Sequence, residues 1–151
     1  MDIQKDRPTL DDIAQTCIAL RLRLLNRVVS NLYDDALRSF GLKISQLNLL
    51  VVIAKLGLAP PAKVCEILHL DTSTLSRNVE RMRSKGWLET VPGEDARMQP
   101  FRLTAQGRKL LARAVPAWAR AQREATKMVG DDGIALLDEA AGKLGFPCAG
   151  P

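Results

Sequence analysis

This sequence predicts a mainly α-helical fold with one small β-hairpin, in a single domain that covers residues 1–151. Three observations lead to this prediction. Apolar residues recur every three or four positions over most of the chain, as the buried face of an α-helix requires. A short segment rich in strand-forming residues follows a glycine beyond the middle of the chain. Hydrophobic residues make up 46% of the sequence, which is enough to form a core in one domain of this length.

The first helical region begins at Leu10 and carries two sets of apolar residues. One set comprises Leu10, Ile13, Cys17, Leu20, Leu24 and Val28, and the other comprises Ile18, Leu22, Leu25, Val29 and Leu32. Together they make this predicted helix apolar over more of its circumference than one buried face needs. The additional apolar surface requires a second partner, so residues 1–40 are predicted to form a dimerisation helix.

Two shorter helices are predicted next. Residues 44–56 are apolar enough to be a buried helix, and residues 61–68 begin with a proline, which suits the first turn of a helix. The residues between them, 58–60, are expected to form a connection.

The following helix is predicted to begin after Asp71, whose carboxylate can accept a hydrogen bond from the backbone N–H of Ser73 or Thr74. Its buried face is expected to hold the apolar residues spaced at i, i+4 and i+7, which are Leu75, Val79 and Met82. The opposite face carries Ser73, Thr74, Arg77, Arg81 and Ser84. Small hydroxyl side chains near the start of a helix, with arginines behind them, suit the major groove of DNA.

A β-hairpin is expected directly after this helix. Gly86 ends the helix, because glycine tolerates the positive φ found there. Residues 87–91 are rich in strand formers, residues 92–95 have the composition of a turn, and residues 101–103 alternate apolar and basic side chains. Pro100 cannot donate to a strand ladder, so the second strand is expected to be short. A helix-turn-helix followed by such a hairpin is a winged helix-turn-helix.

The hairpin tip carries a candidate DNA contact. Asp95 lies two residues before Arg97 and can hold the guanidinium extended through a charge-assisted hydrogen bond. Arg97 can then enter a narrow minor groove, where the electrostatic potential of DNA is most negative.

The C-terminal third predicts two more helices. One has an apolar face of Leu110, Leu111, Ala114, Trp118, Ala121, Ala125 and Met128, and the other has Ile134, Leu137, Ala141 and Leu144. Pro116 is expected to kink the first of them. These helices also have more apolar surface than a small winged helix can cover. Residues 108–151 are therefore assigned, with residues 1–40, to dimerisation, and residues 41–107 to the winged helix-turn-helix.

Charge and cysteine content narrow the class of protein. The net charge is +5, and residues 63–113 alone contribute +4, from 10 basic and 6 acidic side chains, so the excess coincides with the segment predicted to meet DNA phosphates. No apolar run reaches about 20 residues, and the polar N-terminus does not resemble a signal peptide, so a soluble, cytoplasmic protein without membrane contact is expected. Three cysteines, an odd number, do not suggest a disulfide framework.

Several short motifs occur in a fixed order along the chain. They are Ser45-Gln46, the sequence from Ser73 to Arg77, Gly86-Trp87-Leu88-Glu89, Asp95-Ala96-Arg97, and the sequence from Leu103 to Gly107. In this order and spacing they resemble the MarR family of transcriptional regulators, over nearly the whole chain. Ala96 departs from the second charged residue that the family usually has there, and Gln99 and Pro100 replace apolar strand residues.

The resemblance implies a function as well as a fold. It implies an intertwined homodimer that binds a pseudo-palindromic operator in double-stranded DNA, as a repressor. It also implies release by a small-molecule effector, often a phenolic or other aromatic acid, bound in a cleft between the dimerisation helices and the DNA-binding region.

Cys17 supplies an alternative on the same scaffold. The sequence QTCIAL resembles the hydroperoxide-sensing branch of the family, so a thiol-based redox-sensing regulator stays open. Those sensors pair the thiol with tyrosine hydroxyls, and the one tyrosine of this chain, Tyr33, does not fall at their positions. A structural role within the apolar stripe is the favoured interpretation of Cys17.

Other function classes have less support. Cys65 and His69 are spaced at i and i+4, as a nucleophile–base pair or two metal ligands would be, but no third group is evident. Neither an enzyme, nor a metal site, nor any cofactor is predicted. A protein-interaction module that uses the same fold is the remaining class, and in it Arg77, Arg81 and Arg97 would only increase solubility.

Overall fold

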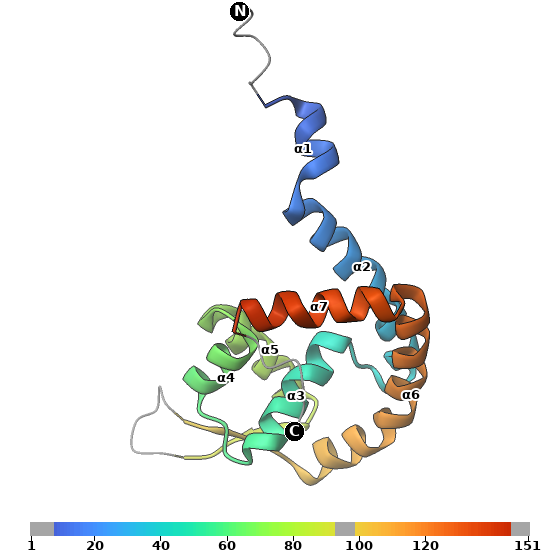
Figure 1. Ribbon diagram of the computed structural model, residues 1–151. Coiled ribbons are helices and arrows are strands. Elements are labelled where there is room, and N and C mark those ends of the chain that lie inside the picture. The colour runs from blue at the N-terminus through green and yellow to red at the C-terminus, as the bar shows by residue number, and fades with distance from the viewer. Residues whose placement is uncertain (1–7, 93–98, 146–151) are drawn as a thin grey trace, which may run out of the picture.

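The computed structural model describes residues 8–92 and 99–145. Their helices and strands are, in chain order, α1 (Leu10–Thr16), α2 (Ile18–Leu37), the short 3-10 helix η1 (Arg38–Phe40), α3 (Ile44–Leu56), α4 (Pro61–Leu68), α5 (Thr72–Ser84), β1 (Leu88–Thr90), β2 (Phe101–Leu103), α6 (Ala105–Val129) and α7 (Asp131–Lys143). Figure 1 shows α3, α4, α5 and the hairpin gathered in one body, with α6 rising along its edge and α1 projecting away from it. The predicted fold class, mainly α with a small β-hairpin, is confirmed.

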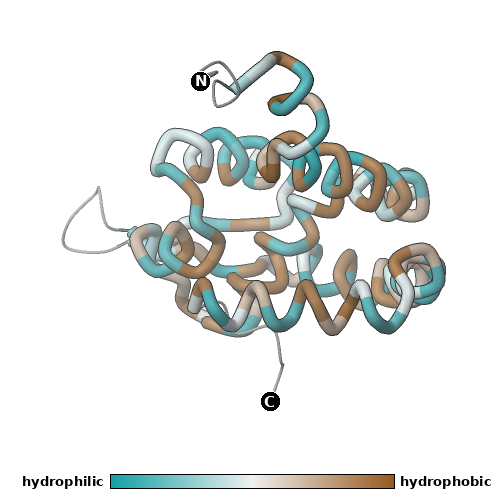
Figure 2. Tube along the Cα trace, turned by 45° about the horizontal axis from the view of Figure 1, so that its top comes forward, coloured by the Kyte–Doolittle hydropathy of each residue, from teal (hydrophilic) through white to brown (hydrophobic). Residues whose placement is uncertain are grey.

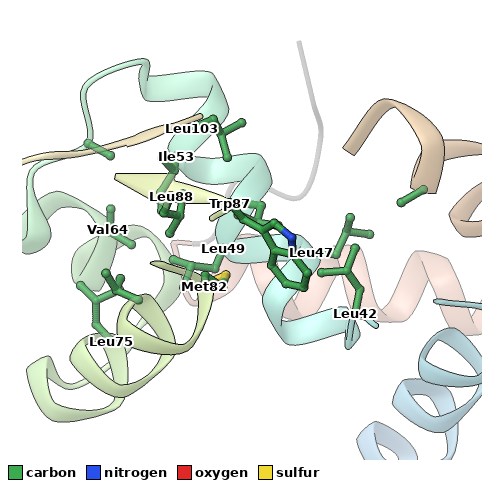
Figure 3. Close-up of a cluster of buried hydrophobic side chains, with 14 of the residues drawn as sticks. Leu42, Leu47, Leu49, Ile53, Val64, Leu75, Met82, Trp87, Leu88 and Leu103 are labelled. Carbon is green, nitrogen blue, oxygen red and sulfur yellow. The ribbon is translucent and has the colours of Figure 1, made fainter. Parts of the chain in front are cut away.

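The main core forms around α3. Leu49, Leu50 and Ile53 of this helix are almost fully buried. They meet side chains from every neighbouring element, among them Val64, Leu75, Met82, Trp87, Leu88 and Leu103, which point toward one another in Figure 3. Each large apolar side chain buried in this way stabilises the fold by about 1.5 to 3 kcal/mol. The predicted inward face of α5, which is Leu75, Val79 and Met82, is confirmed.

Local chain geometry sets both ends of α5. His69, at φ 48°, ends α4 in a left-handed conformation, and the backbone N–H of Leu70 donates to the Cys65 carbonyl over 3.0 Å. At the far end, the N–H of Trp87 donates to the Met82 carbonyl (2.9 Å) and that of Gly86 to the Arg83 carbonyl (2.8 Å). These two bonds, with Gly86 at φ 71°, form a Schellman motif, so Gly86 ends the helix as expected.

The hairpin is short and has a third chain segment beside it. Its antiparallel register pairs Leu88 with Leu103, Glu89 with Arg102 and Thr90 with Phe101. The second strand begins only at Phe101, in agreement with the expected effect of Pro100. Ala59 and Phe101 also exchange both backbone hydrogen bonds, at 2.8 and 2.9 Å. The connection between α3 and α4 therefore anchors the base of the wing, which the sequence did not predict.

The prediction of one continuous helix from Leu10 is wrong at Cys17. This residue has extended geometry (φ −63°, ψ 110°), so it ends α1 and precedes α2. Two local effects favour the break. The Thr16 hydroxyl donates to the Asp12 carbonyl (2.6 Å), and the β-branched residues Thr16 and Ile18 flank the break and weaken helix propensity. Apolar periodicity continues across a single extended residue and does not reveal it.

The helices at the two ends of the chain keep exposed apolar side chains. Neither α1 nor α7 contains a buried residue, and Leu10, Ile18 and Leu144 are 85%, 71% and 72% exposed. Figure 2 shows hydrophobic residues recurring along helices at the outside of the molecule. By contrast, α6 packs on α2 and the core through small residues. The helix continues through Pro116 and curves along its length (Figure 1). Exposed apolar side chains that adjoin one another, as Leu25, Met128 and Leu137 do along one groove, are typical of an interaction surface.

Gly107 supplies a test of the packing at the start of α6. A Cβ at this position would lie 2.1 Å from the Trp87 carbonyl oxygen, a contact that backbone cannot relieve without moving. We expect Gly107→Ala to lower the free energy of unfolding by about 1 to 3 kcal/mol, as overpacking does. Denaturant unfolding measures the change.

The matched control is Gly142→Ala. Gly142 is also helical, and a Cβ there would meet nothing within 4 Å. This variant should be neutral or slightly more stable, because alanine has the higher helix propensity. Equal effects at the two positions would contradict the close contact between α6 and Trp87.

Candidate nucleic-acid interface

The outward face of α5 presents the five helix residues that were predicted to meet DNA. Ser73, Arg77, Arg81 and Ser84 are exposed, and Thr74 is half-buried. Because Leu75, Val79 and Met82 fix the opposite face in the core, rotation of α5 about its axis is restricted. The polar face is thus held toward the outside.

The start of α5 is organised by the Asp71 carboxylate. It accepts hydrogen bonds from the Ser73 hydroxyl (2.6 Å), the Thr74 hydroxyl (2.7 Å) and the Thr74 backbone N–H (2.7 Å). These bonds, with that from Ser73 contributing most, hold the pKa of the Asp71 carboxyl well below its usual range. Both hydroxyl protons are donated to Asp71, which leaves the two hydroxyl oxygens as acceptors. The Thr74 oxygen already accepts a long hydrogen bond from the Arg77 guanidinium, at 3.4 Å.

The arginines of α5 differ in their electrostatic surroundings. Arg83, on the flank of the helix, pairs with Glu80 at 3.2 Å. Arg77 and Arg81 form no ion pair with any residue in the described part of the chain. Positive charge is therefore available on the outward face, while the flank is close to neutral.

The wing is only partly described. Asp95 and Arg97, the two tip residues of the prediction, lie outside the described residues. In the described part, Arg102 on β2 donates to the Glu89 carboxylate on β1 at 2.6 Å, and this ion pair neutralises the strand positions that face each other.

A groove between α5 and the wing was missed from the sequence. It encloses about 270 Å³ and is lined from α5 by Thr72, Ser76 and Arg83 and from the wing by Thr90 and Phe101, among others. No sequence pattern predicts this groove, because it forms only when residues from α4, α5, β1 and β2 meet.

Cys17 and Tyr33 do not form a second site. Cys17 is half-buried at the break before α2, whereas Tyr33 is buried near the other end of that helix, about 24 Å away at 1.5 Å per residue. The Tyr33 hydroxyl donates to the Gln122 side chain on α6, and burial raises the pKa of this phenol. A Cys17 thiol paired with this tyrosine within one chain is excluded by that separation, so the redox alternative is not favoured.

Cys65 and His69 also have local structural roles. Cys65 is half-buried against the main core, and His69 closes the turn between α4 and α5. Within residues 8–92 and 99–145, no group of three or more His, Cys, Asp or Glu side chains could hold a metal ion. Cys148 lies outside the described residues.

No single described helix is long and apolar enough to cross a membrane, although α2 with η1 and α3 reach that length and composition as a pair bent by 74°.

Comparison with known proteins shows which family this architecture belongs to. The model of the MarR family matches residues 40–98. The solved structure of the M. tuberculosis transcriptional regulator MOSR, in complex with DNA, is 36% identical, with a TM-score of 0.71 over 85% of this chain and 98% of that one. The chain belongs to the MarR family. As a MarR-family protein it is a winged-helix transcriptional regulator.

Other MarR-family relatives agree on the fold. A mutant of MarR from E. coli, complexed with operator DNA, has a TM-score of 0.79 and 22% identity over 91% of this chain and 99% of that one. The helix-turn-helix regulator YwoH of Bacillus subtilis is 26% identical over 83 residues, and this match spans 61% of YwoH. The family fold thus extends beyond residues 40–98 to the flanking helices.

Asp71 provides a test of how the start of α5 is organised. Its carboxyl pKa is lowered from 3.8 in the folded state, so its ionised form stabilises the fold at neutral pH, and this stabilisation is lost as the pH falls through the folded value. We expect Asp71→Ala to lower the melting temperature at pH 7. Asp71→Asn, which keeps an acceptor for the Thr74 N–H, should lower it less.

The pH dependence discriminates between a charge effect and a change in shape. The stability difference between the wild type and Asp71→Asn should be constant above about pH 5 and shrink toward zero in stronger acid. A difference that persists unchanged at low pH would show that the charge of Asp71 has no role in the cap.

Proposed function

We propose that this MarR-family protein is a homodimeric repressor that binds a pseudo-palindromic operator in double-stranded DNA and is released by a small-molecule effector. The observation that carries the proposal is the outward face of α5, where oriented hydroxyls and unpaired arginines lie opposite a face fixed in the core. An α-helix fits the major groove, where hydroxyl and guanidinium groups can bond base edges.

The roles within this face follow from chemistry. Arg77 and Arg81 can each donate to guanine or to phosphate, and Ser84 can donate to the phosphate backbone once its hydroxyl leaves the Arg81 carbonyl, to which it donates at 2.8 Å. Ser73 and Thr74, whose hydroxyl protons go to Asp71, are suited to accept hydrogen bonds from base amino groups. Asp95 and Arg97 are proposed to extend the contact into the minor groove through the wing.

Relatives support the choice of DNA as the partner. The M. tuberculosis MOSR structure and the E. coli MarR structure both contain DNA, and MOSR is 36% identical to this chain. A protein-interaction module would not need unpaired arginines on the exposed face of the helix after the turn. The location is proposed to be the cytoplasm.

The dimer is proposed to form through the ends of the chain, residues 1–40 and 108–151. Between α2 and α7 lies an apolar groove of about 630 Å³, lined by Leu25, Val29, Met128 and Leu137 among others. A second copy that covers this groove and α1 would remove the exposed apolar side chains from water. A symmetric dimer presents its two recognition helices to half-sites about one DNA turn apart, roughly 34 Å.

An effector site is proposed between α3 and α6, where a dimerisation helix meets the DNA-binding region of residues 41–107. The hollow there is about 370 Å³ and almost wholly apolar, with Val51, Val115 and Trp118 on its walls and Asn48 as a polar group. This volume lies within the range of small-molecule pockets. An aromatic acid is the class proposed to bind it, with its ring against Trp118 and its carboxylate toward solvent.

Arg77 tests the placement of α5 on DNA. We expect Arg77→Ala to weaken binding to a matched operator by about 1 to 3 kcal/mol and to reduce the preference over scrambled DNA, because a base contact is lost. Arg83→Ala removes the same charge from the same helix but from a residue already paired with Glu80, so its effect should be small and equal on both sequences.

Gel shifts on both DNA fragments measure these changes, and Arg97→Ala extends the test to the wing. That variant should weaken binding evenly across sequences if its contact is electrostatic. If Arg77→Ala and Arg83→Ala behave alike, α5 does not read the operator as proposed.

Leu137 tests the dimer. Leu137→Asp places a charge in the groove between α2 and α7, and it should shift the protein from dimer to monomer at micromolar concentration in sedimentation velocity. The control is Leu58→Asp, because Leu58 is similarly exposed (55% against 51%) but lies between α3 and α4. A wild-type protein that is a well-folded monomer at this concentration would rule out the dimer and the palindromic target.

A further inference from the structure

The C-terminal end of α5 is tied to the end of α2 by one side chain, that of Lys85. This residue caps α5, and its ammonium nitrogen lies 3.1 Å from the carbonyl oxygen of Gly41, in the turn after η1. No sequence pattern singles out Lys85. The bond joins residues 44 positions apart, so it is a tertiary contact between the end of the recognition helix and the turn that follows α2 and η1.

The ammonium of Lys85 also contacts a core side chain. It lies 4.4 Å from the centroid of the Trp87 ring, and Trp87 is buried in the main core. A cation over an indole ring is attracted by the ring's negative face. The Trp87 ring and the Gly41 carbonyl thus both contact the ammonium group. Together they restrict a long side chain that is otherwise free to move.

The backbone on either side of this contact is held by α6. The Lys85 carbonyl accepts a hydrogen bond from Gln106 (3.3 Å), and the Gly86 carbonyl accepts one from the Thr104 hydroxyl (2.6 Å). On the other side, the guanidinium of Arg113 on α6 lies 5.9 Å from the ring of Phe40, next to Gly41. The ends of α2 and α5 and the first half of α6 therefore meet at one joint.

We propose that Lys85 is a positioning residue that fixes α5 relative to α2 and α6, and so sets the separation of the two recognition helices in the dimer. This inference rests on the proposed function. Its reason is geometric: α5 is anchored along its length by apolar contacts that allow small shifts, whereas the bond to Gly41 has a defined direction. Without it, the C-terminal end of α5 can move while each helix still fits its own half-site.

Lys85→Met is the variant that isolates this role. Methionine keeps a long side chain and a favourable sulfur contact with the Trp87 ring but loses the charge and the donor. Lys85→Arg restores both. Lys55→Met is the matched control, because Lys55 is an exposed lysine at the end of α3 for which the described structure shows no hydrogen bond or ion pair.

The measurement is affinity for a series of palindromes whose half-sites are separated by different numbers of base pairs. The wild type and Lys55→Met should prefer one spacing. Lys85→Met should lose this preference by about fivefold or more, the lower end of typical coupling between sites, while its affinity for a single half-site stays unchanged. Lys85→Arg should recover the preference.

A loss of spacing preference in Lys55→Met as well, or its retention in Lys85→Met, would overturn the positioning role. If the wild type binds no palindrome at any spacing, the proposed function fails instead. Hydrogen exchange then decides on Lys85 without DNA: exchange of the backbone amides of residues 41–44 and 85–88 should accelerate in Lys85→Met and not in Lys55→Met. Unchanged exchange in Lys85→Met would overturn the contact itself.

Discussion

Burial of one face of α5 in the main core is the constraint on which the rest of the molecule depends. Leu75, Val79 and Met82 belong to the same buried cluster as Leu49 and Ile53 of α3, and α5 also packs on α4 and β1. Once this contact forms, the direction of every polar side chain on α5 is decided. The capping hydrogen bonds at Asp71 and the Schellman motif at Gly86 then fix the length of the helix, so that its outward face starts and ends at defined points.

Small residues on α6 connect this body to the terminal helices. Ala114, Ala117, Ala121 and Ala125 lie along one side of α6 and allow α2 to approach it closely, and Gly107 leaves space for the Trp87 carbonyl. The Tyr33 hydroxyl lies at this contact and donates to the Gln122 side chain on α6. The same two helices thus serve as a rigid support on one side and as an apolar, exposed surface on the other.

Much of this fold could be predicted from the sequence because its signals are local. Helices at residues 44–56 and 61–68 have the bounds that were expected, since a glycine or a proline marks their ends, and the inward face of α5 follows from spacing alone. The break at Cys17 could not be predicted from the sequence, because a single extended residue does not disturb apolar periodicity. Contacts between distant segments, such as Ala59 with Phe101 and Lys85 with Gly41, carry no sequence pattern, since backbone carbonyls are present at every residue.

The pairing of Ala59 with Phe101 has an evolutionary consequence. Both backbone groups of Phe101 are bonded to Ala59, whose side chain is buried in the main core, so the base of the wing is fixed without help from residues farther along the hairpin. Insertions or deletions beyond that base can change the length of the hairpin while leaving the core intact. In relatives with this fold, changes in one loop can therefore alter how far the wing extends along DNA. Their target sites can diverge while the stability of the core is kept.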